Sequence, residues 1–448
     1  MALKTNKWLV IIGLLIASLL VSHFFISGTD QKTGIAILIF IGGLWVTEAI
    51  PLAAAALLVP VLSALFHIFS IKEALSHFAH PVIFVFIGGF TLATVLNEHG
   101  IDKWIAGKLI HLSKGNKWTV LISMLGFTSF LSMWMSNTAT TAMLLPISMS
   151  LVDRKFPRAR IFVILGTAYA ANIGGIATLI GSPPNLIAGA ILNIDFITWI
   201  KFGLPVTILF FPILLIILRL VIKPEKDFRL DIPDQHPGVW TKKKSMSLAF
   251  FSSVVFLWIG SQPISKLFGF DNFDSIVAIT ATALAPILGL TTWKRFERTT
   301  NWGVLILFGG GLCLSALLSE TGTSEMVAQS ILSNFGSDQG LLLIFISVVF
   351  MVFLTEISSN TGSAAIMVPI VMEVAIQINQ EFVLPMVIGI GMAADCAFML
   401  PVATPPNALA FSSNEFTIGK MMKTGFLLNI IAIILIWLIT SLRFINPF

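Results

Sequence analysis

Long apolar segments separated by short polar breaks run along nearly the whole chain. A helix that crosses the hydrocarbon core of a bilayer needs about 20 predominantly apolar residues. The first segment, 8–25, lacks the small-residue cleavage pattern of a signal peptide and is followed by further apolar segments, so we interpret it as a transmembrane helix. On this length criterion, spans are predicted near residues 8–25, 34–50, 52–68, 80–97, 162–193, 202–222, 246–262, 274–291, 301–318, 383–413 and 424–442.

Two further apolar stretches, 118–151 and 340–378, are interrupted near their centres by the tripeptide Ser-Asn-Thr. Each stretch is too long for one crossing and too polar at its centre for two plain crossings, so we predict two re-entrant helical hairpins. The predicted fold class is an all-α polytopic membrane protein with about 11 transmembrane helices plus these two hairpins.

Composition changes this picture little, but it excludes other classes of protein. Of the 448 residues, 56% are hydrophobic and only 11% are charged, whereas soluble domains carry about 25% charged residues. The net charge of +5 does not indicate nucleic-acid binding, because Lys and Arg lie in the breaks between apolar segments. Cys313 and Cys396 both lie inside apolar stretches, so the sequence predicts neither a disulfide framework nor a zinc site. The expected partner is the lipid bilayer, with no nucleic acid.

The distribution of basic residues predicts the orientation of the chain. With the N-terminus in the cytoplasm, 5 of the 27 Lys and Arg fall outside and the other 22 fall inside. Cytoplasmic loops of membrane proteins carry such an excess of Lys and Arg. We therefore predict a multi-pass protein of the inner (plasma) membrane of the cell, with a cytoplasmic N-terminus. The basic residues placed outside are Lys32, Lys72, Lys201, Lys266 and Arg443.

The chain also repeats itself once, with a nearly constant shift between matching motifs. The Ser-Asn-Thr that begins at Ser136 recurs at Ser359, and the Pro-Pro-Asn that begins at Pro183 recurs at Pro405. A glycine-containing segment at 86–90 matches one at 308–312, and we expect these glycines to allow close helix packing.

The repeat predicts four parts, which are an N-terminal helix at 1–33, a first repeat at 34–222, a cytoplasmic linker at 223–244 and a second repeat at 245–448. In the predicted topology the hairpin at 118–151 has both ends in the cytoplasm, and the hairpin at 340–378 has both ends outside. The repeats are thus predicted to be inverted. Inverted repeats with broken helices at matching positions are typical of secondary transporters, with the binding site where the breaks meet.

The residues at the breaks indicate anion and cation binding. Each Ser-Asn-Thr precedes a helix start, where unpaired N–H groups and a partial positive charge favour a carboxylate. Each Pro-Pro-Asn breaks a span and leaves carbonyl groups, at Gly181 or Ala403, free to coordinate a hard cation such as sodium. Asn185 and Asn407 are expected to bridge the two gaps.

No Lys or Arg lies near either Ser-Asn-Thr. A divalent anion there must be balanced by helix dipoles, hydrogen bonds and bound cations, and two similar cradles suit a substrate with two carboxylates. Two buried acids add alternatives. Asp395 either tunes a cation site, titrates, or pairs with a polar neighbour, and Glu356 faces either the site or the scaffold.

Together with the paired Ser-Asn-Thr motifs, Trp45–Pro51 and Phe398–Asn407 resemble the divalent anion/sodium symporter family over nearly the whole chain. The resemblance implies a homodimer, scaffold and transport domains in each protomer, and an elevator motion. It also implies two sodium sites and a substrate site. The first sodium site maps to Ser132, Ser136, Asn137 and Gly181, and the second to Thr355, Ser358, Asn360 and Ala403. Substrate contacts map to Asn137, Thr138, Ser182, Ser359, Asn360, Thr361, Thr404 and Pro405.

The leading functional hypothesis is a sodium-coupled symporter of C4 dicarboxylates such as succinate, malate or fumarate. The alternatives are a sodium-independent exchanger of di- or tricarboxylates and a sulfate transporter. An enzyme would need convergent acid/base or metal-binding residues, which the breaks do not provide.

The predicted orientation can be tested by thiol labelling of intact cells. A cysteine introduced at Asn334 should react with an impermeant reagent added outside, and one at Lys243 should not, because positive charge retains the Lys243 segment in the cytoplasm. The reverse pattern would overturn the orientation, and equal labelling would contradict the predicted spans.

Overall fold

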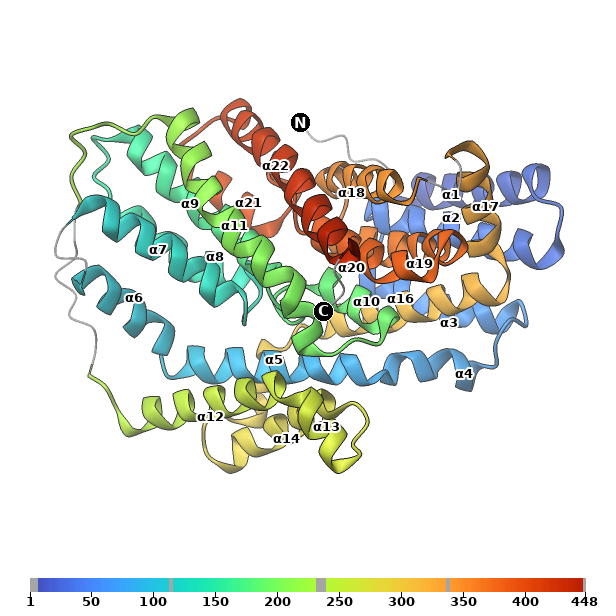
Figure 1. The fold of residues 1–448 in the computed structure, drawn as a ribbon, viewed down its shortest axis with the longest axis horizontal. Coiled ribbons are helices and arrows are strands. Elements are labelled where there is room, and N and C mark those ends of the chain that lie inside the picture. Colours follow the sequence, from blue (N-terminus) through green and yellow to red (C-terminus); the bar gives the residue numbers. More distant parts are fainter. Residues whose placement is uncertain (1–6, 113–115, 231–238, 336–338, 446–448) are drawn as a thin grey trace.

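The computed structural model describes residues 7–112, 116–230, 239–335 and 339–445. Regular structure in these ranges is helical, apart from one isolated β-bridge between Val152 and Leu230 (Figure 1). The helices of the first half are α1 (Lys7–Phe25), α2 (Thr29–Thr47), α3 (Leu52–Leu65), α4 (Ile71–Ser76), α5 (Pro81–Glu98), α6 (Ile101–Leu112), α7 (Lys117–Ser132), α8 (Asn137–Ser150), α9 (Pro157–Gly175), α10 (Pro183–Leu192) and α11 (Phe196–Ile222). Those of the second half are α12 (Lys242–Ile259), α13 (Ser261–Phe268), α14 (Phe273–Ile287), α15 (Trp293–Thr299), α16 (Trp302–Glu320), α17 (Thr323–Phe335), α18 (Gly340–Ile357), α19 (Asn360–Ile378), α20 (Val383–Ala393), α21 (Pro405–Phe411) and α22 (Ile418–Ile445). Single 3₁₀ turns precede α5 (His77–Ala79) and α20 (Gln380–Phe382).

Many of these helices are long and apolar enough to cross a membrane. Seven helical segments of the described ranges meet that standard, or eight if α12 and α13, which meet at 66°, form one bent span. Four shorter apolar helices accompany them, including α3, α10 and α14. The protein is thus an all-α polytopic membrane protein, as the sequence predicts.

Every predicted span contains a helix, but two of them contain breaks of several residues. The span predicted at 162–193 consists of α9 and α10 with a break at 176–182, and that at 383–413 consists of α20 and α21 with a break at 394–404. Consecutive prolines begin α10 and α21, where a missing N–H loses no hydrogen bond, because the N–H groups of the first turn have no partner within the helix. Two shorter helices, α6 and α17, lie outside the predicted spans and occupy matching places in the two halves.

Both predicted hairpins are pairs of helices. α7 and α8 are separated by 133–136, and α18 and α19 by Ser358 and Ser359. Ser136 and Ser359 adopt extended backbone, and their hydroxyl oxygens accept hydrogen bonds from Ala139 N at 3.2 Å and Gly362 N at 3.4 Å. These are N-cap interactions, which explain why a helix begins directly after each serine.

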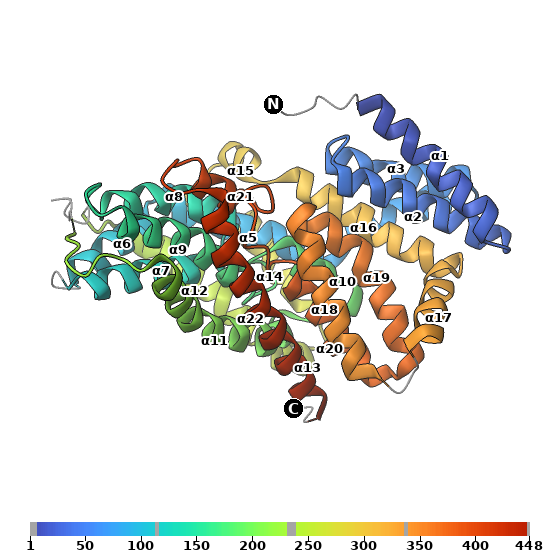
Figure 2. The same cartoon turned by 90° about the horizontal axis from the view of Figure 1, so that it is seen from above.

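The helices α18 and α19 lie beside α16 and α17 in both views of the ribbon, away from α7 and α8 (Figures 1 and 2). α7 and α8 pack on α9, while α10 packs on α19 and α20 and α11 packs on α22. α5 packs on α14, α3 on α16 and α1 on α2, and α19 also contacts α2, α16 and α17. The predicted division into scaffold and transport domains stays a prediction.

Several glycines allow close contacts between helices. A Cβ added at Gly88 would lie 2.7 Å from Ala278 Cβ, and one at Gly310 would lie 2.5 Å from Ala56 Cβ. α5 and α14, and likewise α16 and α3, therefore approach so closely that a side chain at these glycines would force them apart. These contacts account for the two glycine-containing segments of the repeat.

Of the predicted linker, 231–238 lies outside the described residues, and its first part is bound to neighbouring helices. Lys117 Nζ donates hydrogen bonds to the carbonyl oxygens of Lys226 at 2.6 Å and Phe228 at 3.2 Å. Glu225 accepts hydrogen bonds from the backbone N–H groups of Arg158 and Ala159. The chain leaving α11 is thus anchored to the ends of α7 and α9.

Candidate functional site

The first break of the chain lies at the start of α8. Asn137 is the first residue of α8, and its Oδ1 accepts a hydrogen bond from Ser132 Oγ at 2.7 Å. The last residue of α9, Gly175, lies against the same amide, since a Cβ added there would be 2.4 Å from Asn137 Oδ1. Only glycine permits this approach, so the end of α9 and the start of α8 form one compact cluster of oxygen atoms.

Asn185 closes the break between α9 and α10. Its Nδ2 donates to the carbonyl oxygens of Gly175 and Thr178, both at 2.8 Å. The Thr178 hydroxyl in turn donates to the carbonyl of Met133, in the break between α7 and α8. These hydrogen bonds give partners to backbone carbonyl groups that have none within a helix. A chain inside the hydrocarbon core needs such partners, because no water is available there.

The second half contains the same contacts, at the positions that the sequence repeat makes equivalent. Thr355 Oγ1 donates to Asn360 Oδ1 at 2.6 Å, as Ser132 does to Asn137. Asn407 Nδ2 donates to the carbonyl oxygens of Ala397 at 2.9 Å and Leu400 at 3.0 Å, as Asn185 does in the first half. The sequence repeat is therefore also a repeat of hydrogen bonds.

The short helix that follows each Pro-Pro-Asn break packs against the opposite half of the chain. α10 packs against α19 and α20 of the second half, and α21 packs against α8 and α9 of the first. Asn172 Nδ2 on α9 donates to Thr404 Oγ1, the N-cap residue of α21, at 3.2 Å. Ser182 Oγ, at the N-cap of α10, donates to Asp395 Oδ1. All four breaks of the chain are thus joined at one place.

Glu356 supports the break that follows α20. Its carboxylate accepts hydrogen bonds from the backbone N–H groups of Phe398 at 2.7 Å, Met399 at 2.8 Å and Leu400 at 3.1 Å. Asn429 Nδ2 donates to it as well, at 2.7 Å. Glu356 therefore positions the backbone of the break. Of the two alternatives predicted for it, facing the site or the scaffold, these hydrogen bonds support a structural role.

The candidate site residues differ in exposure. Asn137, Asn360, Ser136 and Ser359 are partly exposed, and Thr138 and Pro405 are exposed. None of their hydrogen bonds within the described ranges involves Lys or Arg, and the described residues contain no group of three or more His, Cys, Asp or Glu that could hold a metal ion. The buried members of the predicted set are Ser132, Gly181, Ser182, Thr355, Ser358, Thr361, Ala403 and Thr404.

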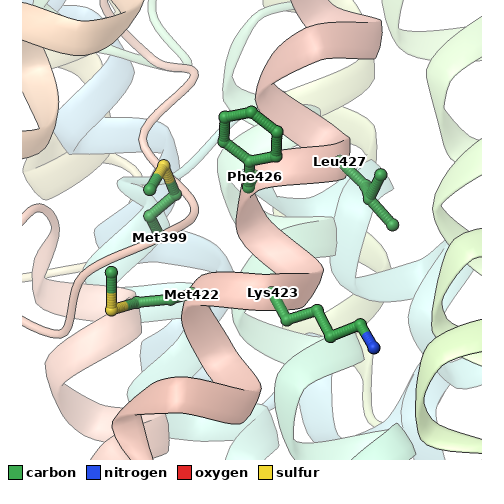
Figure 3. Close-up of a pocket in the computed structure, with 5 residues that line it drawn as sticks. All are labelled: Met399, Met422, Lys423, Phe426 and Leu427. Carbon is green, nitrogen blue, oxygen red and sulfur yellow. The ribbon is translucent and has the colours of Figure 1, made fainter.

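A pocket of about 470 Å³ beside the second break is a different feature. It is lined by Met399, Met422, Lys423, Phe426 and Leu427. Figure 3 shows the two methionine side chains facing each other, with the Lys423 ammonium directed away from them. Thioether, aromatic and alkyl groups offer no strong hydrogen-bond donors, so this pocket is not the candidate anion site.

Asn172 is the site residue that the sequence interpretation missed. It lies inside an apolar helix and is 1% exposed, and at the shift that relates Pro183 to Pro405 its counterpart in the second half is Ala394. The repeat therefore gives no signal at this position. Its partners come from the other half of the chain, and no local pattern indicates them.

Replacing Glu356 with Gln should destabilise the break. The glutamine oxygen can replace only one of the two carboxylate oxygens, so the N–H₂ would face the N–H of Leu400 or those of Phe398 and Met399. Each buried donor left without a partner costs about 1–3 kcal/mol. The thermal unfolding midpoint of the purified protein in detergent should fall. Glu48→Gln, at an exposed position, serves as the control. Equal midpoints for Glu356→Gln and the wild type would contradict this role for Glu356.

Comparison with known proteins places the chain in a family. Residues 42–271 match the family model described as citrate transporter, and residues 236–447 match the sodium:sulfate symporter transmembrane region. The sodium-dependent dicarboxylate transporter SdcS of Staphylococcus aureus is 32% identical over 448 residues, covering 90% of this chain and 84% of that protein. An uncharacterized transporter of Haemophilus influenzae is 42% identical over 418 residues, covering 90% of each chain.

Among solved structures, the YdaH transporter of Alcanivorax borkumensis has a similar fold, with a TM-score of 0.59 and 12% identity, covering 85% of this chain and 89% of that one. At this identity the similarity concerns the fold alone. The identity to SdcS and the two family models carry the assignment: the chain belongs to the divalent anion/sodium symporter family.

Proposed function

We propose that this protein is a secondary active transporter that couples sodium influx to the uptake of C4 dicarboxylates such as succinate, malate or fumarate. The observation that carries the proposal is the pair of matched clusters in which a hydroxyl donates to an asparagine amide oxygen, Ser132 to Asn137 and Thr355 to Asn360. The name of the SdcS relatives supports sodium and a dicarboxylate as the transported pair.

Each cluster has the chemistry of a sodium site. Sodium is a hard cation that takes oxygen ligands, and hydroxyl, amide and backbone carbonyl oxygens gather at each break. When a cation binds, the hydroxyl groups of Ser132 and Thr355 can rotate their protons away and offer lone pairs. Gly181 and Ala403 would contribute carbonyl oxygens, and Ser136 and Ser358 would complete the two sets.

The anion would lie between the clusters. The first turns of α8 and α19 present backbone N–H groups at Thr138 and Thr361, where the positive end of the helix dipole favours a carboxylate. Ser182, Ser359, Thr404 and Pro405 would surround it. One carboxylate at each helix start explains why a dicarboxylate suits two similar cradles better than a single small oxyanion does.

The packing of α10 and α21 on opposite halves of the chain supports a rigid-body mechanism. The two halves are bonded to each other at the breaks through Asn172 and Thr404 and through Ser182 and Asp395. Separating the halves would break these buried contacts, so we infer that both breaks move together, with bound ions, relative to α1–α5 and α12–α17. This motion would be an elevator mechanism, and we propose that it operates in a homodimer of inverted repeats, with the site near the middle of the inner membrane.

The related family models leave two alternative anions to test. Residues 236–447 match a model described as a sodium:sulfate symporter region, and residues 42–271 match one described as a citrate transporter. Competition by sulfate and by citrate against labelled succinate distinguishes these substrates. A sodium-independent exchanger would transport succinate only when substrate is present on both sides.

Uptake of labelled succinate into proteoliposomes should require sodium. With no basic side chain bonded to the candidate residues, cations must balance the dianion, and two sodium ions do so without net charge. Uptake that rises with a negative internal potential would indicate that more than two sodium ions are carried with each dianion. Equal uptake with choline in place of sodium would remove the symport proposal, and a requirement for internal substrate would favour exchange.

Asn137 and Asn360 should each be essential, because each amide would serve a cation and the anion at once. Asn137→Ala and Asn360→Ala should abolish transport while the protein remains monodisperse in detergent. Asn301→Ala, at an exposed position outside the breaks with negative φ, is the matched control. Wild-type transport by both variants would exclude this site.

A further inference from the structure

The breaks after α9 and α20 are each tied to the hairpin of their own half, and at equivalent positions. Hairpin residues correspond at the shift of 223 between the two Ser-Asn-Thr motifs, which pairs Met133 with Glu356. Break residues correspond at the shift of 222 between the two Pro-Pro-Asn motifs, which pairs Thr178 with Leu400. In both halves a hydrogen bond joins the hairpin residue to the break residue of these pairs.

The two hydrogen bonds have the same direction but use different groups. In the second half the Glu356 carboxylate accepts from the backbone N–H of Leu400 at 3.1 Å. In the first half the backbone carbonyl of Met133 accepts from the side-chain hydroxyl of Thr178. A methionine side chain offers only a weak acceptor, so the first hairpin has no carboxylate at this place. The Thr178 hydroxyl therefore does for the first break part of what Glu356 does for the second.

Thr178 also fixes the break within itself. Its hydroxyl oxygen accepts a hydrogen bond from Gly181 N at 3.1 Å, and the residue is 2% exposed. A hydroxyl group has one proton, which Thr178 donates to Met133, so its donor capacity is fully used. One buried hydroxyl thus joins two parts of the first candidate sodium site, which are the backbone next to Ser132 and the backbone at Gly181.

The first break is also closely packed around the candidate ligands. A Cβ added at Gly181 would lie 2.4 Å from the carbonyl oxygen of Gly175, and one added at Gly175 would lie 2.4 Å from Asn137 Oδ1. The counterparts of these glycines in the second half are Ala403 and Ala397. The backbone of the first break therefore lies directly on the Asn137 amide, and a small displacement of Gly181 changes the spacing of these oxygen atoms.

We propose that Thr178 is a positioning residue for the first sodium site, an inference that rests on the proposed function. Thr178 acts through Gly181 rather than by touching the ion. Its hydroxyl holds the Gly181 carbonyl in place relative to Ser132 and Asn137, so that the ion binds without reordering the break. The second site has no hydroxyl at the equivalent position, so loss of the Thr178 hydroxyl weakens the binding of one of the two sodium ions.

Thr178→Val tests the proposal, because valine has the same branched shape but no hydroxyl. Succinate uptake into proteoliposomes is measured as a function of sodium concentration. The half-saturating sodium concentration should rise about fivefold, as expected for the loss of one hydrogen bond. Uptake at saturating sodium should equal that of the wild type. Thr178→Ser keeps the hydroxyl and should restore the wild-type sodium dependence.

Sodium binding is also measured without transport. The purified full-length protein is unfolded thermally in detergent, without succinate, across a sodium series balanced with choline. An ion that binds only the folded state raises the unfolding midpoint as its concentration increases. Thr178→Val should need more sodium than the wild type for the same rise in midpoint, and Thr178→Ser should not.

Thr91→Val is the matched control. Thr91 is 1% exposed, and its hydroxyl donates to the carbonyl oxygen of Ile87 and lies 3.0 Å from Thr282 Oγ1, outside the breaks. Its replacement should leave the sodium dependence unchanged. Thr178→Cys keeps the proposal testable if Thr178→Val does not fold. Because a thiol is a weak donor, its half-saturating sodium concentration should also exceed that of the wild type.

Two results would overturn the positioning role. One is an identical sodium dependence of the wild type and Thr178→Val in both assays. The other is a lower uptake at every sodium concentration with an unchanged half-saturating concentration, which would assign Thr178 a structural role alone. A wild type that responds to sodium in neither assay would instead overturn sodium coupling itself. Sodium stabilisation without succinate uptake would refute only the substrate, and the unfolding assay would still decide the role of Thr178.

Discussion

A chain that stops being helical at membrane depth must find partners for its backbone N–H and carbonyl groups, and the rest of this structure depends on how that requirement is met. Asn185 and Asn407 each bind two carbonyl groups of a broken helix, ten and seven residues before them in the chain. Glu356 binds three consecutive N–H groups of the second break. The breaks are therefore ordered, and the oxygens left over are held in place for ligands.

Holding the breaks in place also brings the two halves together. α10 and α21 each pack on the opposite half, and the polar contacts at their starts join residues from opposite halves of the chain. Gly175 permits this compactness, since its missing side chain is where the Asn137 amide lies. A site built this way has contributions from both halves at every point, which favours movement of the site as one body over separation of its halves.

Charge is the second constraint on the site. The residues at the breaks are hydroxyls, amides and backbone groups, with Asp395 as a buried acid beside Ser182. The proposed anion beside a charged Asp395 would need a cation or a proton to offset the repulsion in a region of low dielectric constant.

Local chemistry in the sequence was enough to predict the helices, the breaks and the repeat. Ser136 and Ser359 cap helices, and Pro183 and Pro405 begin them, through interactions within a few residues of the chain. The resemblance to a family then indicated the candidate residues, and the structure brings Ser132 to Asn137 and Thr355 to Asn360. The short helices α6 and α17 were missed because they are neither long nor apolar enough to be recognised as spans.

Only the tertiary structure decided that Glu356 supports the break rather than the ligand, that Asn172 belongs to the site, and that Asp395 faces Ser182. These contacts join segments 42 to 235 residues apart, and such pairings depend on how helices pack, which periodicity and capping within a single segment do not specify.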